Sequence, residues 1–318
     1  MRREMDRVLV TGAGGFMGSH LVERLLDDGA RVTAVVRRTS VQVPHPVAEN
    51  LAARAGDDRL DVAAVDLAGP SATEFMSAQQ APVWIHLAAD AYVPASLTEP
   101  SAVIRNNVMS TVNVLDAAVR RGPTLVIVAS SSEVYGHNDV PLAEDSPLRP
   151  TTPYAASKVA TDHIAMSYFR AFSIPVIVVR PFNCYGPRHR YDVIPLFIAR
   201  ALRGEPLIVN GDGRQTRDFT YVSDTVEALV RICAGGEVGS VLNIGSGNDT
   251  SILDLARMIK DGAGSASPIV HGPARRGEVR RMCCSADALT AATGWRPRVP
   301  LADGLRRTIA YAAERRHR

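Results

Sequence analysis

The sequence predicts an α/β fold, with a doubly wound parallel sheet and a smaller C-terminal lobe. Short apolar runs alternate with amphipathic stretches of helical length from about residue 7 onward, which is typical of successive strand–helix–strand units. The first apolar run leads directly into a glycine-rich turn, "TGAGGFMG", and then into an amphipathic stretch. The chain of 318 residues is long enough for one large domain or two unequal ones.

Composition narrows the functional classes. With 46% hydrophobic and 22% charged residues the chain reads as globular, and a net charge of +3 is too small to indicate nucleic-acid binding. No apolar run approaches the roughly 20 residues of a membrane span, so no membrane partner is predicted. The N-terminus passes straight into strand-like sequence without the features of a signal peptide, and a cytoplasmic location is therefore expected.

The four cysteines, Cys184, Cys233, Cys283 and Cys284, show no CxxC spacing. The adjacent pair, Cys283 and Cys284, is poorly placed to ligate one metal ion together. In a reducing compartment we expect all four to be thiols, and no metal site is predicted.

The glycine-rich turn is the first candidate binding site. Gly12, Gly15 and Gly18 form a GxxGxxG pattern between a predicted strand and a predicted helix. Glycines there permit a tight turn and close approach of the backbone to a pyrophosphate, which would face the N-terminus of the helix. The pattern predicts a Rossmann-type dinucleotide site, with Phe16 and Met17 also in contact with the cofactor, and the alternative is a plain tight turn.

The end of the second predicted strand bears on the type of dinucleotide. An acidic residue there would bind the ribose 2′-hydroxyl of NAD, but the chain has Val36, Arg37 and Arg38. Because arginine can pair with a 2′-phosphate, Arg37 and Arg38 favour NADP over NAD. The alternative is that both arginines are only solvated.

Two further strands are predicted to end at the cofactor. "LDVAAVDL" is expected to form a third strand that ends in Asp66, with Asp66 at the adenine and Leu67 also touching the cofactor. "PVWIHLAAD" is expected to form a fourth strand running into a turn of small residues, against which a cofactor can lie. His86 is interpreted as a packing residue at the strand end rather than a base. The contacts expected from this turn are Leu87, Ala88 and Ala89.

Hydroxyl groups and a carboxylate follow the fifth predicted strand. "TLVIVASSSEVYG" reads as a buried strand that ends in the segment from Ser130 to Glu133. Parallel sheets bind their ligands at the carboxyl ends of the strands. These side chains would therefore face the cleft onto which the glycine-rich turn opens.

The next helix, expected to begin near Pro153, carries Tyr154 and Lys158. At a spacing of four residues the two side chains lie on one helical face, one turn apart. The ammonium would favour the tyrosinate, lower the pKa of the phenol from about 10 and make Tyr154 a proton acceptor. The alternative is an ordinary surface pair.

Six motifs, in order, carry a resemblance to a known family: "TGAGGFMG", "HLAAD", "SSSEVYG", "PYAASK", "RPFNCYGPR" and "GDGRQTRDFTYVSD". From about residue 7 to about residue 312 the chain closely resembles the extended short-chain dehydrogenase/reductase family, specifically its nucleotide-sugar epimerases and dehydratases. The resemblance implies a tightly bound NAD(P) and a nucleotide diphosphate sugar as substrate.

The resemblance also implies catalytic roles. In this family the bound nicotinamide takes a hydride from C4 of the sugar, elimination, decarboxylation or inversion can follow, and the hydride is then usually returned. Carried over, Tyr154 takes the 4-hydroxyl proton, Lys158 lowers its pKa and holds the nicotinamide ribose, and Ser131 hydrogen-bonds the 4-oxygen. Glu133 would take the C5 proton in a dehydration.

The fate of the C4 ketone depends on the residues after Ser131. The dTDP-glucose dehydratases resemble one another in a Thr-Asp-Glu motif, whereas this chain has Ser131, Ser132 and Glu133, which keeps the glutamate and lacks the acid. The expected reaction is 4,6-dehydration of an NDP-hexose. The alternatives are an NDP-sugar 4-epimerase, then a UDP-glucuronate decarboxylase, then an NADPH-dependent 4-ketosugar reductase. Glu133 could also serve only to hydrogen-bond the following loop.

Substrate contacts are implied for Ser132, Asn183, Arg217 and Arg281, the two arginines at the diphosphate. Surface solvation is the competing interpretation of both arginines. Ser285 departs from the resemblance, since relatives usually have Asp at this place.

The expected division assigns residues 1–182, with about 223–244, to the dinucleotide-binding domain. Residues 183–222 and 245–318 would form the nucleotide-sugar-binding lobe. A homodimer is expected through the helices that include residues 103–119 and 159–172.

Overall fold

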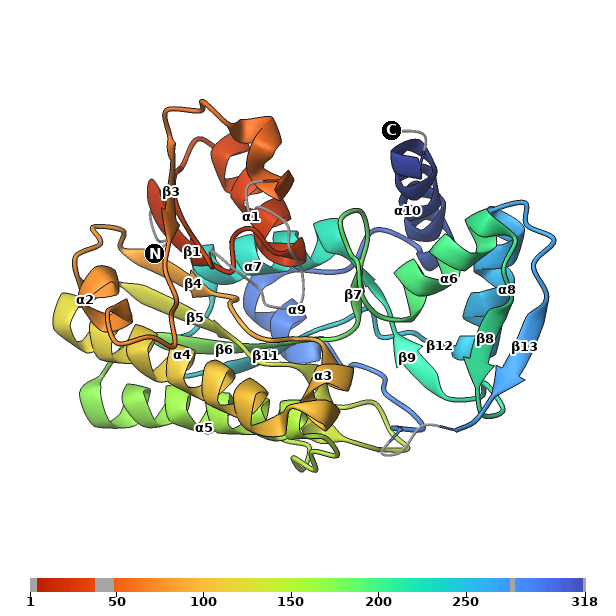
Figure 1. The fold of residues 1–318 in the computed structure, drawn as a ribbon. Helices are drawn as coiled ribbons and strands as arrows, with labels where there is room; N and C mark the ends of the chain where they lie inside the picture. The colour runs from red at the N-terminus through yellow and green to blue at the C-terminus, as the bar shows by residue number, and fades with distance from the viewer. Residues whose placement is uncertain (1–4, 38–48, 275–277, 317–318) are drawn as a thin grey trace.

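The computed structural model describes residues 5–37, 49–274 and 278–316, and these form an α/β structure around a seven-stranded parallel sheet (Figure 1). The strand order β11-β6-β5-β4-β1-β2-β3 runs outward in both directions from the β1–β4 pair, as in a doubly wound sheet. The predicted fold class is confirmed. The strands are β1 (Arg7–Thr11), β2 (Arg31–Val36), β3 (Leu60–Ala64), β4 (Val83–His86), β5 (Leu125–Ala129), β6 (Val176–Pro181) and β11 (Val241–Ile244).

Helices cover both faces of this sheet, with α1 and α7 on one side and α2, α4 and α5 on the other (Figure 1). Successive side chains of a strand point to opposite faces of the sheet. Each strand therefore contributes to two separate hydrophobic cores, one on each face. Val83 and Ile85 pack in the core that includes Leu25 of α1, whereas Trp84 packs in the core that includes Leu115 of α4. Burial on both faces explains the continuous apolar runs of the sequence. The helices are α1 (Phe16–Asp27), α2 (Ala72–Ser77), α3 (Val93–Thr98), α4 (Pro100–Arg121), α5 (Pro153–Phe172), α7 (Val222–Gly235) and the 3-10 segments η1 (Glu49–Arg54) and η2 (Ser132–Tyr135).

Local signals set the ends of the two longest helices. Thr152 caps α5, its Oγ1 accepting a hydrogen bond from the backbone N–H of Ala155 at 3.1 Å, and Pro153 occupies the first turn. Helix α4 ends at Gly122, which adopts the left-handed conformation. Both helices therefore lie where the sequence predicts them.

The second lobe, to the right in Figure 1, contains short sheets and helices. Helix α7 and strand β11 return from it to the large sheet, where β11 pairs with β6. The division into two domains stays a prediction. The lobe elements are β7 (Cys184–Tyr185), α6 (Val193–Arg203), β8 (Leu207–Asn210), β9 (Thr216–Asp218), β10 (Thr220–Tyr221), β12 (Asp249–Ser251), α8 (Ile252–Gly262), β13 (Ile269–Gly272) and α10 (Leu301–Arg316). Helix α9 (Asp287–Thr293) lies instead beside α7 and β11.

The third strand is shorter than predicted. Strand β3 ends at Ala64, close to the end of its partner β2 at Val36. Asp66 instead closes a turn, since its Oδ1 accepts a hydrogen bond from the backbone N–H of Ala68 at 3.1 Å. Strand β3 thus ends two residues earlier than the apolar pattern indicates, and Asp66 lies in the turn that follows it.

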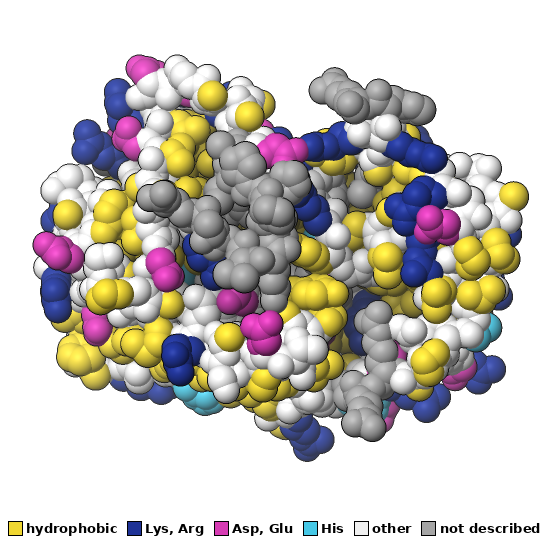
Figure 2. Space-filling view, viewed as in Figure 1, with side chains coloured by type: hydrophobic (Ala, Val, Ile, Leu, Met, Phe, Trp, Pro, Cys, Tyr) yellow, Lys and Arg dark blue, Asp and Glu magenta, His cyan; other side chains and the backbone are white. Residues whose placement is uncertain are grey.

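The surface carries charges of both signs, with basic and acidic side chains interspersed on the face in Figure 2. In the part of the chain that the structure describes, no helix is long and apolar enough to cross a membrane. The same residues contain no group of three His, Cys, Asp or Glu side chains that could hold a metal ion.

Candidate active site

The glycine-rich turn joins β1 to α1 and packs closely against its surroundings. Gly12 has a φ of +67°, and a Cβ there would lie 2.8 Å from the backbone nitrogen of Ala88. A Cβ on Gly18 would lie 2.2 Å from the carbonyl oxygen of Gly12. Gly15, at the N-cap of α1, is exposed. The turn therefore presents bare backbone and the first turn of a helix at the carboxyl edge of the sheet, which suits a pyrophosphate. Phe16 and Met17 begin the helix there.

The predicted adenine-side residues have different environments. Asp66 is exposed and caps its own turn, while Leu67 is buried in the core beside α4. Arg37 follows β2 and forms an ion pair with Asp90 at 2.9 Å. Arg38 lies outside the described residues.

The turn after β4 is fixed to β1. The backbone N–H groups of Leu87 and Ala88 donate to the carbonyl oxygen and the hydroxyl of Thr11, respectively, and Ala89 follows. His86 is buried between the hydroxyls of Thr11, 2.8 Å from Nδ1, and Thr111. Burial lowers the pKa of His86 to about 3, so it is a neutral packing residue, as predicted.

The structure brings Ser131, Tyr154 and Lys158 together. The hydroxyl of Ser131 shares a hydrogen bond with that of Tyr154 and also accepts from the backbone N–H of Glu133 at 3.2 Å. Tyr154 and Lys158 are both buried on α5, and Lys158 Nζ donates to the carbonyl oxygen of Ala129, at the end of β5, at 2.7 Å. The surface-pair alternative is therefore wrong.

The predicted lowering of the Tyr154 pKa is not found. Burial raises the pKa of Tyr154 above its ordinary value, the hydrogen bond from Ser131 offsets this only in part, and the carboxylates of Glu133 and Asp192 add to the increase. The spacing of Tyr154 and Lys158 in the sequence gives no information on burial. Burial disfavours the charged phenolate, and this effect is larger than the effects that lower the pKa.

Glu133 lies beside these hydroxyls in η2. Burial raises the pKa of its carboxyl group, the charge of Arg217 opposes the increase, and the charges of Asp192 and Glu278 support it. Glu133 thus lies within electrostatic reach of groups from both lobes. A carboxyl group with a raised pKa is suited to proton transfer near neutral pH.

Three residues near the site were missed in the sequence. Asp192 and Glu278 act electrostatically on Glu133, and Asp90 pairs with Arg37. Asp192 is the N-cap residue of α6, has a φ of +73° and makes no side-chain capping bond, although an Asp before an apolar helix reads as a simple cap. Asp90 is the last residue of the "HLAAD" motif. In a doubly wound sheet β4 and β2 are both neighbours of β1, and this order could have indicated that Asp90 lies near the end of β2.

The loop between β7 and α6 joins the second lobe to α1. Arg188 Nη2 pairs with Glu23 at 2.6 Å, and His20 Nε2 lies 2.9 Å from the carbonyl oxygen of Pro187. The rings of Phe16 and His189 stack with centroids 4.6 Å apart. The loop that leads to Asp192 is therefore fastened to the helix that begins at the glycine-rich turn.

The residues expected to contact the substrate lie in two places. Asn183 and Arg217 belong to the second lobe, and Ser132 follows β5. Asn183 Oδ1 is buried and has no hydrogen-bond partner among the residues that the structure describes, which suits a donor from a ligand. Arg217 donates from Nη1 to the carbonyl oxygen of Val279 at 2.7 Å and acts on Glu133. Ser132 is buried in η2.

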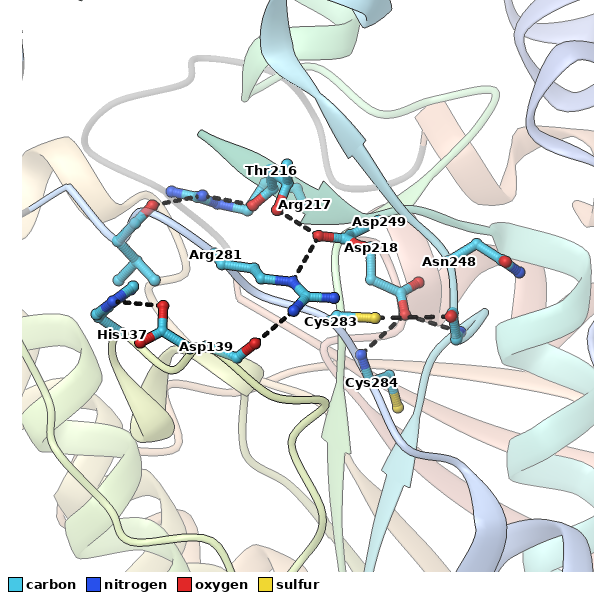
Figure 3. A network of polar contacts seen from close by, with 12 residues as sticks. His137, Asp139, Thr216, Arg217, Asp218, Asn248, Asp249, Arg281, Cys283 and Cys284 are labelled. Atoms are coloured by element: carbon cyan, nitrogen blue, oxygen red, sulfur yellow. Dashed lines mark hydrogen bonds and ion pairs between the residues drawn. The ribbon is translucent and has the colours of Figure 1, made fainter. Parts of the chain in front are cut away.

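Arg281 is already engaged. Its Nε lies 3.1 Å from Asp249 Oδ2, and its Nη1 donates to the carbonyl oxygen of Asp139, as Figure 3 shows. The guanidinium thereby links β12 to the loop after η2. Its expected role at the diphosphate stays a prediction.

Comparison with known proteins agrees with this geometry. The model of the "NAD dependent epimerase/dehydratase family" matches residues 8–245. A dTDP-glucose 4,6-dehydratase of an Actinoplanes species is 34% identical over 96% of this chain and 97% of its own, and a UDP-glucose 4-epimerase of Mycolicibacterium smegmatis is 34% identical over 96% and 98%. The structure of DesIV, a dTDP-glucose 4,6-dehydratase from Streptomyces venezuelae with NAD and TYD bound, superposes with a TM-score of 0.90 at 32% identity, covering 98% of both chains. The chain therefore belongs to the NAD dependent epimerase/dehydratase family of enzymes, within the extended short-chain dehydrogenase/reductase class that its motifs resemble.

Proposed function

We propose that this enzyme catalyses the 4,6-dehydration of a nucleotide diphosphate hexose. The observation that carries the proposal is the meeting of the Ser131–Tyr154 hydroxyl pair with Glu133, a carboxyl group whose pKa is raised by burial. Abstraction of a C5 proton needs such a base beside the groups that act on C4. The similar dTDP-glucose 4,6-dehydratases, one with NAD and TYD bound, support the proposal.

The described residues fit a nicotinamide dinucleotide. Gly12 and Gly18 leave no room for a Cβ, so the turn packs tightly against its own backbone and against Ala88. Gly15, exposed at the N-cap of α1, leaves the backbone there accessible to a pyrophosphate. Lys158 lies at the end of β5, where it could hold the nicotinamide ribose. A cofactor of this kind supplies a reversible acceptor for the hydride on C4 of the sugar.

The side chains then divide the proton transfers among them. Tyr154 takes the proton of the 4-hydroxyl, and Ser131 holds the 4-oxygen. The ketone at C4 acidifies the hydrogen on C5, which Glu133 removes. The C6 hydroxyl then leaves as a C5–C6 double bond forms, and the proton that Tyr154 took from the 4-hydroxyl balances its departure as water. Return of a hydride to C6 would be accompanied by return of the proton from Glu133 to C5, which leaves the ketone at C4.

The nucleotide part of the substrate is proposed to bind in the second lobe. Asn183 offers a buried acceptor, and Arg217 lies within electrostatic reach of Glu133, so a sugar at Glu133 would bring its diphosphate toward this guanidinium. Arg281 would have to exchange its contact with Asp249 to bind a phosphate.

A 4-epimerase is the second candidate. Ser132 stands where dTDP-glucose dehydratases have an acidic residue, and the M. smegmatis 4-epimerase is as similar to this chain as the Actinoplanes dehydratase. Epimerisation needs Ser131 and Tyr154 and leaves Glu133 without a catalytic role.

The deciding experiment is mass spectrometry of incubations with UDP-, dTDP- and GDP-hexoses. Dehydration predicts a product lighter by about 18 Da, whereas an isomer of equal mass would indicate epimerisation and a loss of about 44 Da from a uronate would indicate decarboxylation. Consumption of added NADPH with a 4-ketosugar would indicate a reductase.

Assembly and location stay predictions. We propose a homodimer through α4 and α5, whose exposed apolar side chains include Ile104, Met109 and Phe172. Light scattering should give twice the chain mass, and Met109→Glu should reduce it to one chain mass. A cytoplasmic location can be checked by cell fractionation.

The comparisons do not test the predicted preference for NADP. Arg37, the described residue on which that prediction depends, is paired with Asp90. We propose NAD as the cofactor for this reason.

A further inference from the structure

Asp162 is a buried carboxylate on α5 to which the proposed reaction gives no role. It lies four residues after Lys158, so the two side chains share one face of the helix, one turn apart. Lys158 and Asp162 are 4% and 3% exposed. Lys158 Nζ donates to the carbonyl oxygen of Ala129, which carries no net charge, so a buried ammonium group here needs a carboxylate nearby. Asp162 is placed to provide that charge.

The guanidinium of Arg180, on β6, holds Asp162 and continues to η2. Arg180 Nε lies 2.8 Å from Asp162 Oδ2, and Arg180 Nη1 donates to Tyr135 Oη at 2.7 Å. Tyr135 is the last residue of η2, the segment that carries Glu133. The ion pair therefore joins the helix that carries the candidate proton acceptor to the segment that carries the candidate C5 base.

The three buried charges act on one another. Burial lowers the pKa of Lys158 to about 8, and the negative charge of Asp162 opposes this decrease. Burial raises the pKa of Asp162, whereas the guanidinium of Arg180 and the ammonium of Lys158 oppose the increase and favour the carboxylate. Asp162 thus favours the protonated form of Lys158, and Arg180 favours the ionised form of Asp162.

The other titratable groups of the surrounding elements do not replace this carboxylate. His86, at the end of β4, is neutral because burial lowers its pKa to about 3. Glu133, in η2, lies beside the hydroxyl of Tyr154, and Asp116, on α4, accepts a hydrogen bond near the C-terminal end of α5. Strand β5 contributes apolar side chains alone. Among the described residues, Asp162 is the carboxylate that acts on the ammonium of Lys158.

We propose that Asp162 is a positioning residue that holds the buried side chain of Lys158 as an ammonium group beside Tyr154, with Arg180 as the counter-charge of Asp162. Burial disfavours the tyrosinate of Tyr154, and a nearby ammonium group offsets this effect, whereas a neutral amine does not. The consequence for catalysis rests on the proposed function, in which Tyr154 takes the 4-hydroxyl proton.

The chain has two lysines, Lys158 and Lys260, so the titration of Lys158 can be followed directly. Full-length protein labelled with ¹³C at the lysine Cε should give two NMR signals, and Lys158→Met identifies the signal of Lys158. The measured quantity is the pKa of Lys158. Asp162→Asn should lower this pKa by about one unit or more, and Asp162→Glu should keep it within about half a unit of the wild-type value.

Arg180→Met is the matched control, because it breaks the same buried pair and removes the opposite charge. It should leave the pKa of Lys158 unchanged or raise it, since Asp162 then acts on Lys158 alone. A purely structural role of the pair would admit water in both variants and raise the pKa of Lys158 in both. A pKa of Lys158 that is unchanged or higher in Asp162→Asn would therefore overturn the inference.

The pH profile of turnover tests the consequence for catalysis. In the wild type the rate should fall as the pH rises through the pKa of Lys158, and in Asp162→Asn this alkaline limb should move to lower pH by as much as the pKa. Asp162→Glu should leave the limb in place. An unmoved limb in Asp162→Asn would overturn the positioning role. If the wild type turns over no NDP-hexose, the proposed function fails, and the NMR titration still decides whether Asp162 keeps Lys158 charged.

Discussion

Lys158 donates a hydrogen bond from Nζ to the carbonyl oxygen of Ala129 at 2.7 Å, and this bond joins helix α5 to the end of strand β5. Tyr154 lies one helical turn before Lys158, and Ser131 lies two residues after Ala129. The same contact therefore sets the position of the Tyr154 phenol next to the Ser131 hydroxyl. Lys158 orders the candidate active site through the backbone as well as through its charge.

This buried ammonium predicts a pH dependence of stability. Burial lowers the pKa of Lys158 to about 8 from an ordinary value of 10.5. Between these values the unfolded chain binds a proton that the folded chain has lost, so the free energy of unfolding rises with pH. Relative to Lys158→Met, the wild type should gain up to about 3 kcal/mol from pH 8 to pH 10.5. Urea denaturation of both proteins at several pH values measures the difference; a difference that is flat or falls with pH would contradict this account.

Removal of the Tyr154 hydroxyl should stop catalysis and leave cofactor binding intact. Tyr154→Phe keeps the ring packed on α5 and lacks the proton acceptor, so turnover should fall by about a hundredfold to ten-thousandfold or more. The measurements are product formation and the cofactor absorbance of the purified protein. Tyr135→Phe is the control, because Tyr135 is also buried and its hydroxyl bonds Asn243 and Arg180 instead. The Tyr135→Phe variant should be less stable and keep its activity per folded molecule. Near-normal turnover by Tyr154→Phe would contradict the mechanism.

A buried ion pair supports the loop that carries Glu133. Arg180 Nε pairs with Asp162 at 2.8 Å, with both side chains at most 5% exposed, and Arg180 Nη1 donates to Tyr135 Oη at 2.7 Å. Because Arg180→Met strands the Asp162 carboxylate, it should lower the free energy of unfolding by about 3–5 kcal/mol. Arg257→Met breaks a pair on the surface of α8 and should change stability by about 0.5 kcal/mol or less. Chemical denaturation measures the free energy of unfolding of both variants. Equally small decreases in the two variants would show that the buried pair does not contribute this stability.

Much of the fold could be predicted because its physics is local. Every residue of β5 is buried, and a continuous apolar run is what a strand covered on both faces requires. The proximity of Ser131 and Tyr154 could also be predicted. Ser131 follows the carboxyl end of β5, where parallel sheets bind ligands, and Tyr154 lies in the first turn of the next helix.

Other features depend on contacts between segments that are distant in the sequence. The spacing of residues within one motif gives no information on such contacts. The partner of Arg37 follows from the order β4-β1-β2, and the partners of Arg281 come from β12 and from the loop after η2. The raised pKa of Tyr154 results from burial, which a four-residue spacing cannot report. Strand β3 ends at Ala64, opposite the last residue of its partner β2, and the apolar pattern of one segment does not contain the length of its partner.

The central claim is that Glu133 takes the C5 proton after oxidation at C4. Turnover of the accepted NDP-hexose in D₂O, followed by NMR, measures the incorporation of deuterium at C5. Glu278→Gln is the matched control, since Glu278 acts on the pKa of Glu133 from a distance, and it should retain exchange. The account predicts that Glu133→Gln still oxidises C4 and loses C5 exchange by about a hundredfold or more. Exchange at the wild-type rate in Glu133→Gln would contradict proton abstraction by Glu133, whereas no C5 exchange in the wild type would favour the 4-epimerase.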